Sequence, residues 1–410
     1  MATFLNEQLD LITSWCETSS LWSLIGTAVI LVGVCAAVRR WLERSSAPTL
    51  SNLEDETDIK NPTIKPLMDF DWQNTEPLQL RSFQGKHKYN LTMVSTSLLH
   101  DQQCCANAPQ AIENLDPSEM IPMDKTYKDR LALRQKILKE HHDIAVAVNE
   151  SATADPRTDS AVSELYLFIL GKYLPGRYPS MFKLHPSTKE KPEHFENLVT
   201  GASWPIKVSA EMSTIHALEI LAQTVDEEFL ILLPDLSSPN QPKYILQAYA
   251  TCFPSGFNTR QKLGLRLADI HGPVPKYAEK LERSMDRFFA KIEVGRVVKR
   301  VNWSINTEGT GLFHAFDSEK EVQTIKPGEL NVNQTFLRSE RQTLHRLPHS
   351  KALIFAFHTY LYPLQEIKDE GLGEELAVAI EGLNKGNVPG IYEYKDGDYW
   401  GEATKHFLRS

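Results

Sequence analysis

One histidine in this sequence stands in an unusually stiff setting. In the stretch IHGPVP, His271 is followed by prolines at positions 273 and 275. Each proline fixes its own φ and biases the residue before it toward extended conformations, so the chain leaves the histidine along a restrained path. Such a frame can aim an imidazole at a ligand. It can equally serve only to turn the chain into the next helix, and from residue types alone this second reading is the commoner one for a lone histidine.

A second stretch, RSERQTLHRLP, is dense in polar groups. Successive side chains of a strand point to opposite faces, so one face would carry Arg338, Glu340 and Gln342, and the other Arg341, Thr343 and His345. A solvated edge strand with a surface ion pair would explain this pattern without any function. The following stretch, ALIFAFHTYL, is strongly apolar and should lie in the core. Its polar neighbour can therefore line an internal pocket.

The stretch RVNW adds one more cation, Arg300, to the residues that such a pocket could hold. A guanidinium presents a planar set of donors that suits carboxylates and other anionic groups.

The elements that position these residues can be read from hydrophobic periodicity. Helical spacing appears from Tyr127, from Ser213 and over 276–292, and a further amphipathic helix covers GEELAVAIEGL. Strands are indicated at 229–235 and 243–253, which flank a turn-rich segment, and in RVVKRVNWSI, QTFLRSERQTL and ALIFAFHTYL. Five strands with a helix inserted after the second predict an α+β domain with a largely antiparallel sheet.

Composition and motifs exclude several classes of function. The 410 residues carry a net charge of −9, so nothing favours nucleic-acid binding. The five cysteines form neither a CxxC pair nor an iron–sulfur spacing, which favours a reducing compartment. Walker A, GxGxxG, HExxH and GxSxG motifs are absent from the sequence.

An uncharged stretch near the N-terminus predicts a membrane anchor. Residues 18–38 contain no charge, and as a helix they would reach roughly 30 Å, the thickness of a bilayer's hydrocarbon core. A signal peptide would need a basic segment before it, and here that segment is acidic. Arg39, Arg40 and Arg44 follow the stretch, so the positive-inside rule places the rest of the chain in the cytosol. The sequence therefore predicts a single-pass membrane protein, with the endoplasmic reticulum as one candidate membrane.

The expected organisation has four parts: a short N-terminal segment 1–17, a transmembrane helix 18–38, a polar linker 39–65 and a catalytic domain 66–410. The linker lacks hydrophobic periodicity, which is typical of a tether.

Several stretches taken together resemble the haem-dependent oxidative N-demethylase family, of the alpha-subunit-like type. They are VDEEFLILLPD, ATCFPSGFNTRQKLGLRLADIHGPVPKY, DRFFAKI, RVNWSI and RSERQTLHRLPHSKALIFAFHTYLYPL, in this order. FDWQNTEPLQLRSFQGKHKYNLTM, PMDKTYKDRLALRQKIL and LYLFILGKYLPGRYPSMF fit the same family. The resemblance covers roughly residues 65–370, and the N-terminal stretch is an addition to it.

The resemblance implies a PAS-like α+β domain that binds haem b. It further implies an enzyme that uses O₂ to hydroxylate the methyl carbon of an amine or a related secondary metabolite, after which the carbinolamine loses formaldehyde. Electrons would come from NADPH through flavin and iron–sulfur partners. Because this sequence has no dinucleotide fingerprint and no four-cysteine cluster, the reductase would be a separate protein.

Site residues follow from the resemblance position by position. The family's IHxPVP motif falls on His271, the expected axial ligand of the haem iron, and Lys262, Arg266 and Arg300 are expected to bind the cofactor. The RxERQTL motif supplies the catalytic candidates Arg338, Glu340 and Arg341, with Glu340 suited to a cationic amine or to proton transfer. His345 and His358 are rival ligands.

Two other functions remain open at this stage. PAS-like domains often sense rather than react, so the chain could be a non-catalytic haem sensor. A single-pass glycosyltransferase would use the anchor and the acidic triplet Asp69–Asp71, but a three-residue motif is weak.

Overall fold

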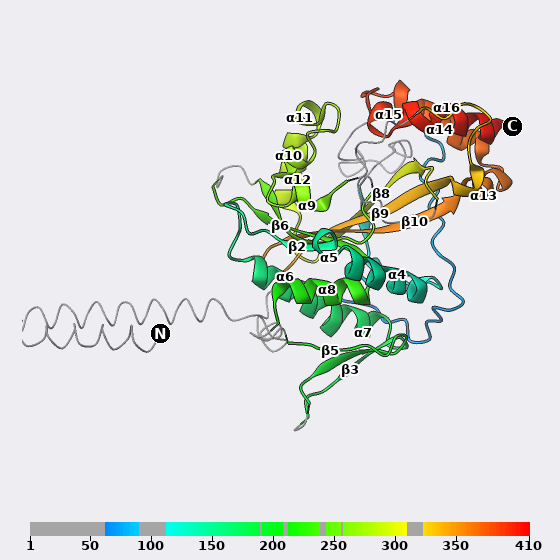
Figure 1. The fold of residues 1–410 in the computed structure, drawn as a ribbon. Helices are drawn as coiled ribbons and strands as arrows, with labels where there is room; N and C mark the ends of the chain where they lie inside the picture. The colour runs from blue at the N-terminus through cyan, green and yellow to red at the C-terminus, as the bar shows by residue number, and fades with distance from the viewer. Residues whose placement is uncertain are drawn as a thin grey trace, which may run out of the picture. The chain divides into compact units, whose positions relative to one another are not determined.

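A seven-stranded antiparallel sheet forms the centre of the folded part. The computed structural model describes residues 62–89, 112–188, 191–207, 212–237, 243–255, 257–309 and 323–410, all within one compact unit, Pro48–Ser410. Strand order is β1-β8-β9-β10-β6-β7-β2 (Figure 1). The strands are β1 Glu113–Leu115, β2 Val146–Val148, β6 Glu228–Pro234, β7 Tyr244–Ala250, β8 Val297–Asn306, β9 Phe336–Arg346 and β10 Leu353–Pro363.

One layer of helices packs on the lower face of the sheet in Figure 1. Its apolar core includes Leu131 and Leu218 from the helices and Ile231 and Ile354 from the strands. The layer consists of α4 Tyr127–Glu140, α6 Thr158–Phe168, α7 Leu174–Arg177 and α8 Thr214–Thr224, with a π-helical segment Ile169–Tyr173 joining α6 to α7 and a short α5 His142–Ala145 after α4. A separate three-stranded sheet, β3 Phe182–His185, β4 His194–Asn197 and β5 Ser203–Pro205, lies beyond these helices.

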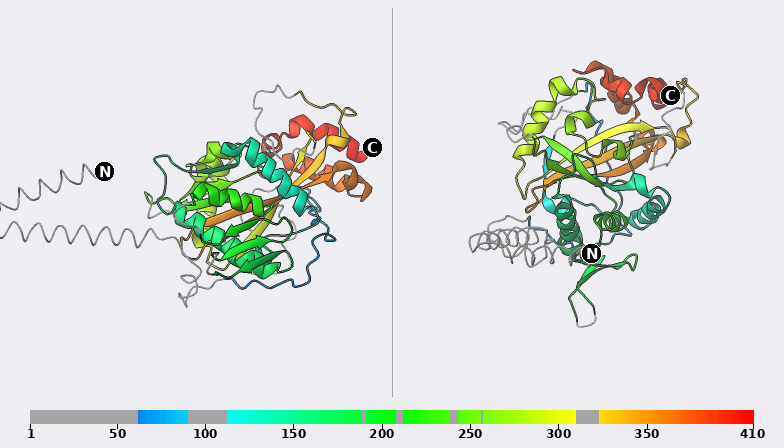
Figure 2. Two further views of the ribbon diagram at one scale, coloured as in Figure 1. Left: turned by 60° about the horizontal axis from the view of Figure 1, so that its bottom comes forward. Right: turned by 60° about the vertical axis from the view of Figure 1, so that its left-hand side comes forward.

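A second layer covers the opposite face, and the two views of Figure 2 show the sheet between the layers. This layer has its own apolar core, to which α12, α14 and the sheet contribute Met285, Ile380 and Leu344. Its helices are α9 Thr259–Lys262, α10 Leu267–Ile270, α11 Tyr277–Lys280, α12 Glu282–Lys291, α13 Leu364–Asp369, α14 Gly373–Lys385, α15 Ile391–Tyr394 and α16 Gly397–Arg409. Several of these are single turns, and they bring irregular chain close to the sheet.

The α+β class and the antiparallel sheet predicted from the sequence are confirmed. All five expected strands exist, at 228–234, 244–250, 297–306, 336–346 and 353–363. The expected helix over 276–292 is two helices, because Leu281, at φ −118° and ψ −38°, interrupts the hydrogen-bond ladder between α11 and α12. The short strands β1 and β2 and the small second sheet were not predicted. That the fold is PAS-like stays a prediction.

The membrane assignment needs correction. No helix in the described ranges is both long enough and apolar enough to cross a bilayer. The longest helical run, 158–177, includes Glu164 and Lys172, and its apolar side chains pack in the protein core instead of facing lipid. The span expected at 18–38 lies outside the described residues. The structure therefore does not support a single-pass membrane protein with a cytosolic body.

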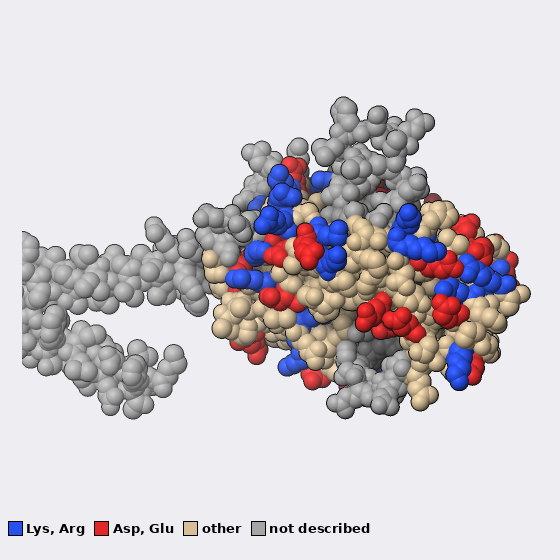
Figure 3. Space-filling view, turned by 90° about the horizontal axis from the view of Figure 1, so that it is seen from above, with Lys and Arg blue, Asp and Glu red and all other residues tan. Residues whose placement is uncertain are grey.

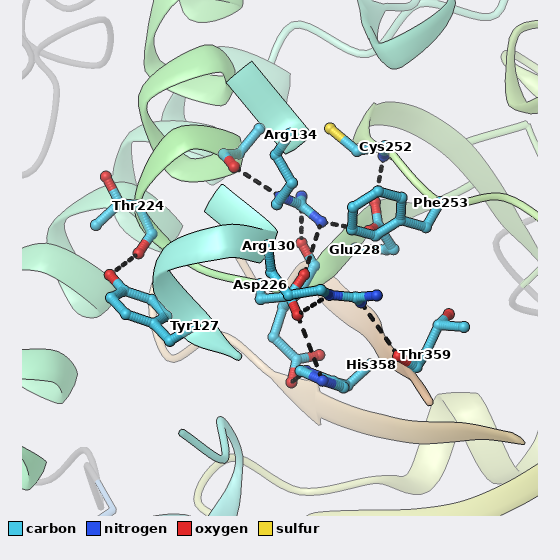
Figure 4. Close-up of polar contacts among 12 residues, drawn as sticks. Tyr127, Arg130, Arg134, Thr224, Asp226, Glu228, Cys252, Phe253, His358 and Thr359 are labelled. Atoms are coloured by element: carbon cyan, nitrogen blue, oxygen red, sulfur yellow. Dashed lines mark hydrogen bonds and ion pairs between the residues drawn. The ribbon is translucent and has the colours of Figure 1, made fainter. Parts of the chain in front are cut away.

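A network of buried charges ties α4 to the sheet (Figure 4). Arg134, which is fully buried, donates from Nε to the carbonyl oxygen of Ala222 at 2.7 Å and forms an ion pair with Glu228. Arg130 donates to Asp226 Oδ2 at 2.6 Å. Glu228 also accepts the backbone N–H of Cys252 on the far side. Buried charges of this kind are tolerated because each finds an opposite charge.

Replacing Arg134 by methionine should destabilise the fold strongly. The substitution keeps the apolar volume but leaves the Glu228 carboxylate buried without its cation, which costs about 3–5 kcal/mol. Urea unfolding followed by circular dichroism measures the loss. The matched control is Lys136→Met on the exposed face of the same helix, which should change the free energy of unfolding by less than about 0.5 kcal/mol. Equal losses in both variants would contradict a special role for the buried pair.

Candidate functional site

His271 ends the single-turn helix α10 and lies against the sheet side of the second helical layer. Its Nδ1 donates a hydrogen bond to the carbonyl oxygen of Leu267 at 2.8 Å. Its ring stacks on Tyr277, the first residue of α11, with the ring centroids 4.9 Å apart and the planes at 9°. The imidazole is thus held by a carbonyl on one side and an aromatic ring on a face. The Gly-Pro-Val-Pro segment, residues 272–275, leads from His271 toward α11.

This arrangement fixes the chemical form of the imidazole. The pKa of His271 is lowered to about 4, mainly by burial and also by the nearby Arg300 and Lys262, against the opposing effect of the Leu267 carbonyl. The ring is therefore neutral near pH 7. Because the carbonyl oxygen of Leu267 can only accept a hydrogen bond, Nδ1 carries the proton and the lone pair is on Nε2. A neutral imidazole whose other nitrogen is hydrogen-bonded to a carbonyl is the usual form of a metal-ligating histidine.

A hydrogen-bonded row of side chains runs along one face of β9 and onto β8. Arg338 Nε lies 3.4 Å from Glu340 Oε1, Gln342 Nε2 donates to Glu340 Oε2 at 3.1 Å, and Arg300 Nε donates to Gln342 Oε1 at 2.6 Å. The register explains the row, since Arg300 of β8 pairs with Gln342 and Asn302 with Glu340. These residues therefore share a face as the sequence pattern predicted.

Two lysines add to the positive charge of this face. Lys395, just after α15, donates from Nζ to the carbonyl oxygen of Trp303 at 2.6 Å and to Asn302 Oδ1 at 3.0 Å. Lys262 of α9 places its Nζ over the Phe257 ring at 3.8 Å. Burial lowers the pKa of each lysine to about 8, and the Glu340 carboxylate acts in the opposite direction on both.

We call Lys262, Arg300, Arg338 and Lys395 the cation cluster. Among the described residues the Glu340 carboxylate acts electrostatically on all four, and Arg338, which contacts it at 3.4 Å, also interacts with Glu228. Burial is the main cause lowering the pKa of Arg300, so its charge is poorly solvated. Poorly solvated cations in excess of their counter-ion favour an anionic ligand, and both Arg300 and Lys262 also act on His271.

The donor set fits a haem. One neutral imidazole with its Nε2 lone pair available can ligate the iron, and cations beside it can bind carboxylate substituents of the cofactor. Five of the seven predicted site residues are linked by electrostatic interactions: Lys262 and Arg300 act on His271, and Glu340 acts on Lys262, Arg300 and Arg338.

The other two predicted residues lie elsewhere. Arg266 forms an ion pair with Asp235 at 2.6 Å at the surface. Arg341 projects from the opposite face of β9, where its guanidinium donates to the carbonyl oxygens of Glu119 and Met120. Arg341 thereby fixes the segment before α4, and its neighbour in the RxERQTL motif, Glu340, belongs to the other side of the sheet.

The rival histidines have less suitable surroundings. Burial opposes the charged form of His358, but Asp226 and Glu227, with ion-pair distances of 3.4 and 3.7 Å, outweigh it and raise its pKa, so the ring tends to be an imidazolium. His345 is neutral, since burial lowers its pKa to about 4, and neither ring nitrogen has a partner within the described chain. It borders a cavity of about 20 Å³, room for one water molecule rather than a haem.

The acidic triplet at 69–71 has a local structural role. Asp71 accepts hydrogen bonds from the backbone N–H of Gln73 and Asn74 and from the Asn74 side chain, which closes a turn. In the described part of the chain no group of three or more His, Cys, Asp or Glu side chains could hold a metal ion. The triplet therefore gives no support to a glycosyltransferase.

Sequence reasoning missed Lys395 and its neighbour Tyr394. Burial and, to a smaller extent, the Glu340 carboxylate raise the pKa of Tyr394, although this side chain remains 48% exposed. The stretch YEYKDGDYW looks like an ordinary polar turn before a helix. The hydrogen bonds of Lys395 with Asn302 and Trp303 of β8 reveal its role, and no local pattern encodes them.

The fold and the site together define an α+β protein with a histidine and a cation cluster suited to an anionic, metal-containing cofactor. Comparison with known families agrees with this class. Residues 111–405 match the family described as haem-dependent oxidative N-demethylase, alpha subunit-like. The match covers well over half of the chain, and the chain belongs to this family.

His271 and His358 should differ in charge at pH 6. We expect His271 to be neutral with its proton on Nδ1, because its pKa is about 4, whereas His358 should be protonated between its two carboxylates. Nitrogen-15 NMR of histidine-labelled protein distinguishes these forms, with His271→Gln and His358→Gln variants for assignment. A protonated His271 at pH 6 would contradict the environment described above.

Proposed function

We propose that this chain is a haem-dependent oxidative enzyme that removes a methyl group from an amine, using O₂ and electrons supplied by another protein. Family membership supports the oxidative, haem-dependent class. The observation that carries the proposal for this chain is the hydrogen bond from His271 Nδ1 to the Leu267 carbonyl, which leaves Nε2 free to bind iron.

In this proposal His271 would ligate the iron of haem b, and Lys262, Arg300 and Lys395 would bind its carboxylates. Binding of an anion would raise the depressed pKa of both lysines toward the ordinary value, which makes the ionic contacts favourable. Arg266 is left out of this role because Asp235 already holds it at the surface.

The reaction that fits the family description balances as R₂N–CH₃ + O₂ + 2 e⁻ + 2 H⁺ giving R₂NH, formaldehyde and water. The haem supplies oxygen activation when bound. The chain's own contribution lies in Glu340, whose two oxygens are held by Arg338 and Gln342 so that the carboxylate has a fixed position. A fixed carboxylate can bind a protonated amine or transfer a proton.

The electrons are proposed to come from NADPH through a separate reductase with flavin and iron–sulfur centres. The sequence carries no dinucleotide-binding fingerprint or four-cysteine cluster that would hold these groups in this chain. The substrate is a small methylated amine or a related secondary metabolite. Formaldehyde release under NADPH and a reductase separates this enzyme from a haem sensor, which would bind haem and release none.

The first test is the absorption spectrum of the full chain purified with ample haem. We expect a Soret band that weakens or shifts in His271→Ala, because the iron loses its axial nitrogen. Millimolar imidazole should restore the wild-type spectrum by filling the vacated position. The control His345→Ala removes the other neutral buried histidine and should leave the band in place. A wild-type chain without a Soret band would sink the haem assignment, and an unchanged band in His271→Ala would remove this residue as ligand.

The second test concerns Glu340. The variant Glu340→Gln keeps the size of the side chain but loses its charge and one of its two acceptor oxygens, so formaldehyde release should slow by about 10²–10⁴-fold while the Soret band persists. Ser339→Ala, at the neighbouring position on the opposite face of β9, is the matched control and should keep nearly the wild-type rate. An unaffected rate in Glu340→Gln would exclude the carboxylate from proton transfer and amine binding.

A further inference from the structure

Five exposed basic residues form a stripe along α11 and α12. They are Lys276, Lys280, Arg283, Arg287 and Lys291, which we call the basic stripe. Arg283, Arg287 and Lys291 follow at intervals of four residues and share one side of α12. Lys280 ends α11, and Lys276 precedes this helix in a left-handed conformation with φ 58°. Among the described residues none of the five takes part in an ion pair. Figure 3, which views this side from above, shows Lys and Arg side chains grouped over this region.

The two acidic residues of α12 share one lysine as their partner. Lys243, just before β7, binds Glu282 at 2.6 Å and Asp286 at 2.8 Å. These two contacts also fix the orientation of α12. Glu279 is the exposed acidic residue of α11, so the five basic residues leave an excess of positive charge on this side, on a chain whose overall charge is −9.

The inner side of α12 is fully used by the core. Met285 and Phe289 are 5% and 8% exposed, and both pack in the upper hydrophobic cluster. The helix therefore has no apolar face left to insert into a lipid surface, as a membrane-binding amphipathic helix requires. A protein partner that recognises charge fits this surface better.

The basic stripe lies next to the proposed haem ligand. Lys276 is the residue immediately before Tyr277, and the buried ring of Tyr277 stacks on His271 with the centroids 4.9 Å apart. One side chain, that of Tyr277, thus separates the backbone of the stripe from the imidazole. A partner bound to the basic stripe would therefore lie closer to His271 than a partner bound on the other face of the sheet.

We infer that the basic stripe is the docking surface for an acidic electron-transfer protein that carries a flavin or an iron–sulfur cluster. The inference rests on the proposed function, since a haem enzyme that consumes two electrons per turnover needs a reductant and this sequence holds no motif for one. Opposite charge would steer such a partner to this face, while the acidic remainder of the chain repels it elsewhere.

The test uses the full haem-loaded chain and an acidic [2Fe–2S] ferredoxin, reduced by NADPH and its reductase, as the probe. The variant Arg283→Glu/Arg287→Glu reverses two charges of the stripe. The control Lys128→Glu/Lys136→Glu makes the same change of charge on exposed residues of α4, in the helical layer on the other face of the sheet. Anaerobic stopped-flow absorbance measures haem reduction, and dithionite replaces the ferredoxin in a parallel series.

At low salt we expect the stripe variant to be reduced by ferredoxin at least about tenfold more slowly than wild type and the control. The difference should vanish near 1 M salt, where the Debye length is ~3 Å. Dithionite should reduce all three proteins alike.

Equal ferredoxin rates in the two variants, or no reduction of the wild type, would overturn the inference. Binding of the wild type to phosphatidylserine vesicles with loss in the stripe variant would replace the protein partner by a lipid surface. A failure of haem binding itself is seen separately, as a missing Soret band. In that case calorimetry of the ferredoxin with the haem-free chain still decides whether the stripe binds.

Discussion

The site depends on one constraint: strand β9 lies in the middle of the sheet and is shielded from water, yet it carries charged side chains on both faces. Arg338, Glu340 and Arg341 are 2%, 6% and 6% exposed. A buried charge is tolerated only with a partner, so each face of β9 must provide counter-charges or hydrogen-bond acceptors. The neighbouring elements meet this demand differently on the two sides.

On the side of α4, carbonyl oxygens and carboxylates satisfy the arginines almost completely, and the result is a rigid attachment of the helix layer. On the side of α10 and α15, cations outnumber the single carboxylate, and the electrostatic balance is incomplete within the described chain. A surface that lacks counter-charge is one that favours an anionic ligand. The same strand therefore anchors the fold through one face and supports the proposed haem site through the other.

Part of the fold and of the candidate site could be predicted from the sequence, for physical reasons. Period-two alternation correctly separated Glu340 from Arg341, since strand geometry leaves no other choice once the strand is recognised. The apolar ALIFAFHTYL segment correctly indicated a buried neighbour. Arg266 and Lys395 illustrate the limit: whether a basic side chain enters the site depends on the ion pair with Asp235 and on the hydrogen bonds of Lys395 with β8, which are tertiary contacts. The break at Leu281 and the short edge strands leave too little periodic signal. The membrane prediction rested on the uncharged stretch 18–38 and its charged flanks, which lie outside the described residues.

The contact of Lys395 with the sheet also bears on when the site can exist. Lys395 binds the amide of Asn302, which precedes it by 93 residues. At translation rates of about 5–20 residues per second, the lysine is synthesised roughly 5–20 seconds after the strand that it binds. His271 and the β8 arginine are thus made well before the last cation joins them. The complete cation cluster, and with it the proposed haem site, can therefore form only after α15 and Lys395 have been synthesised.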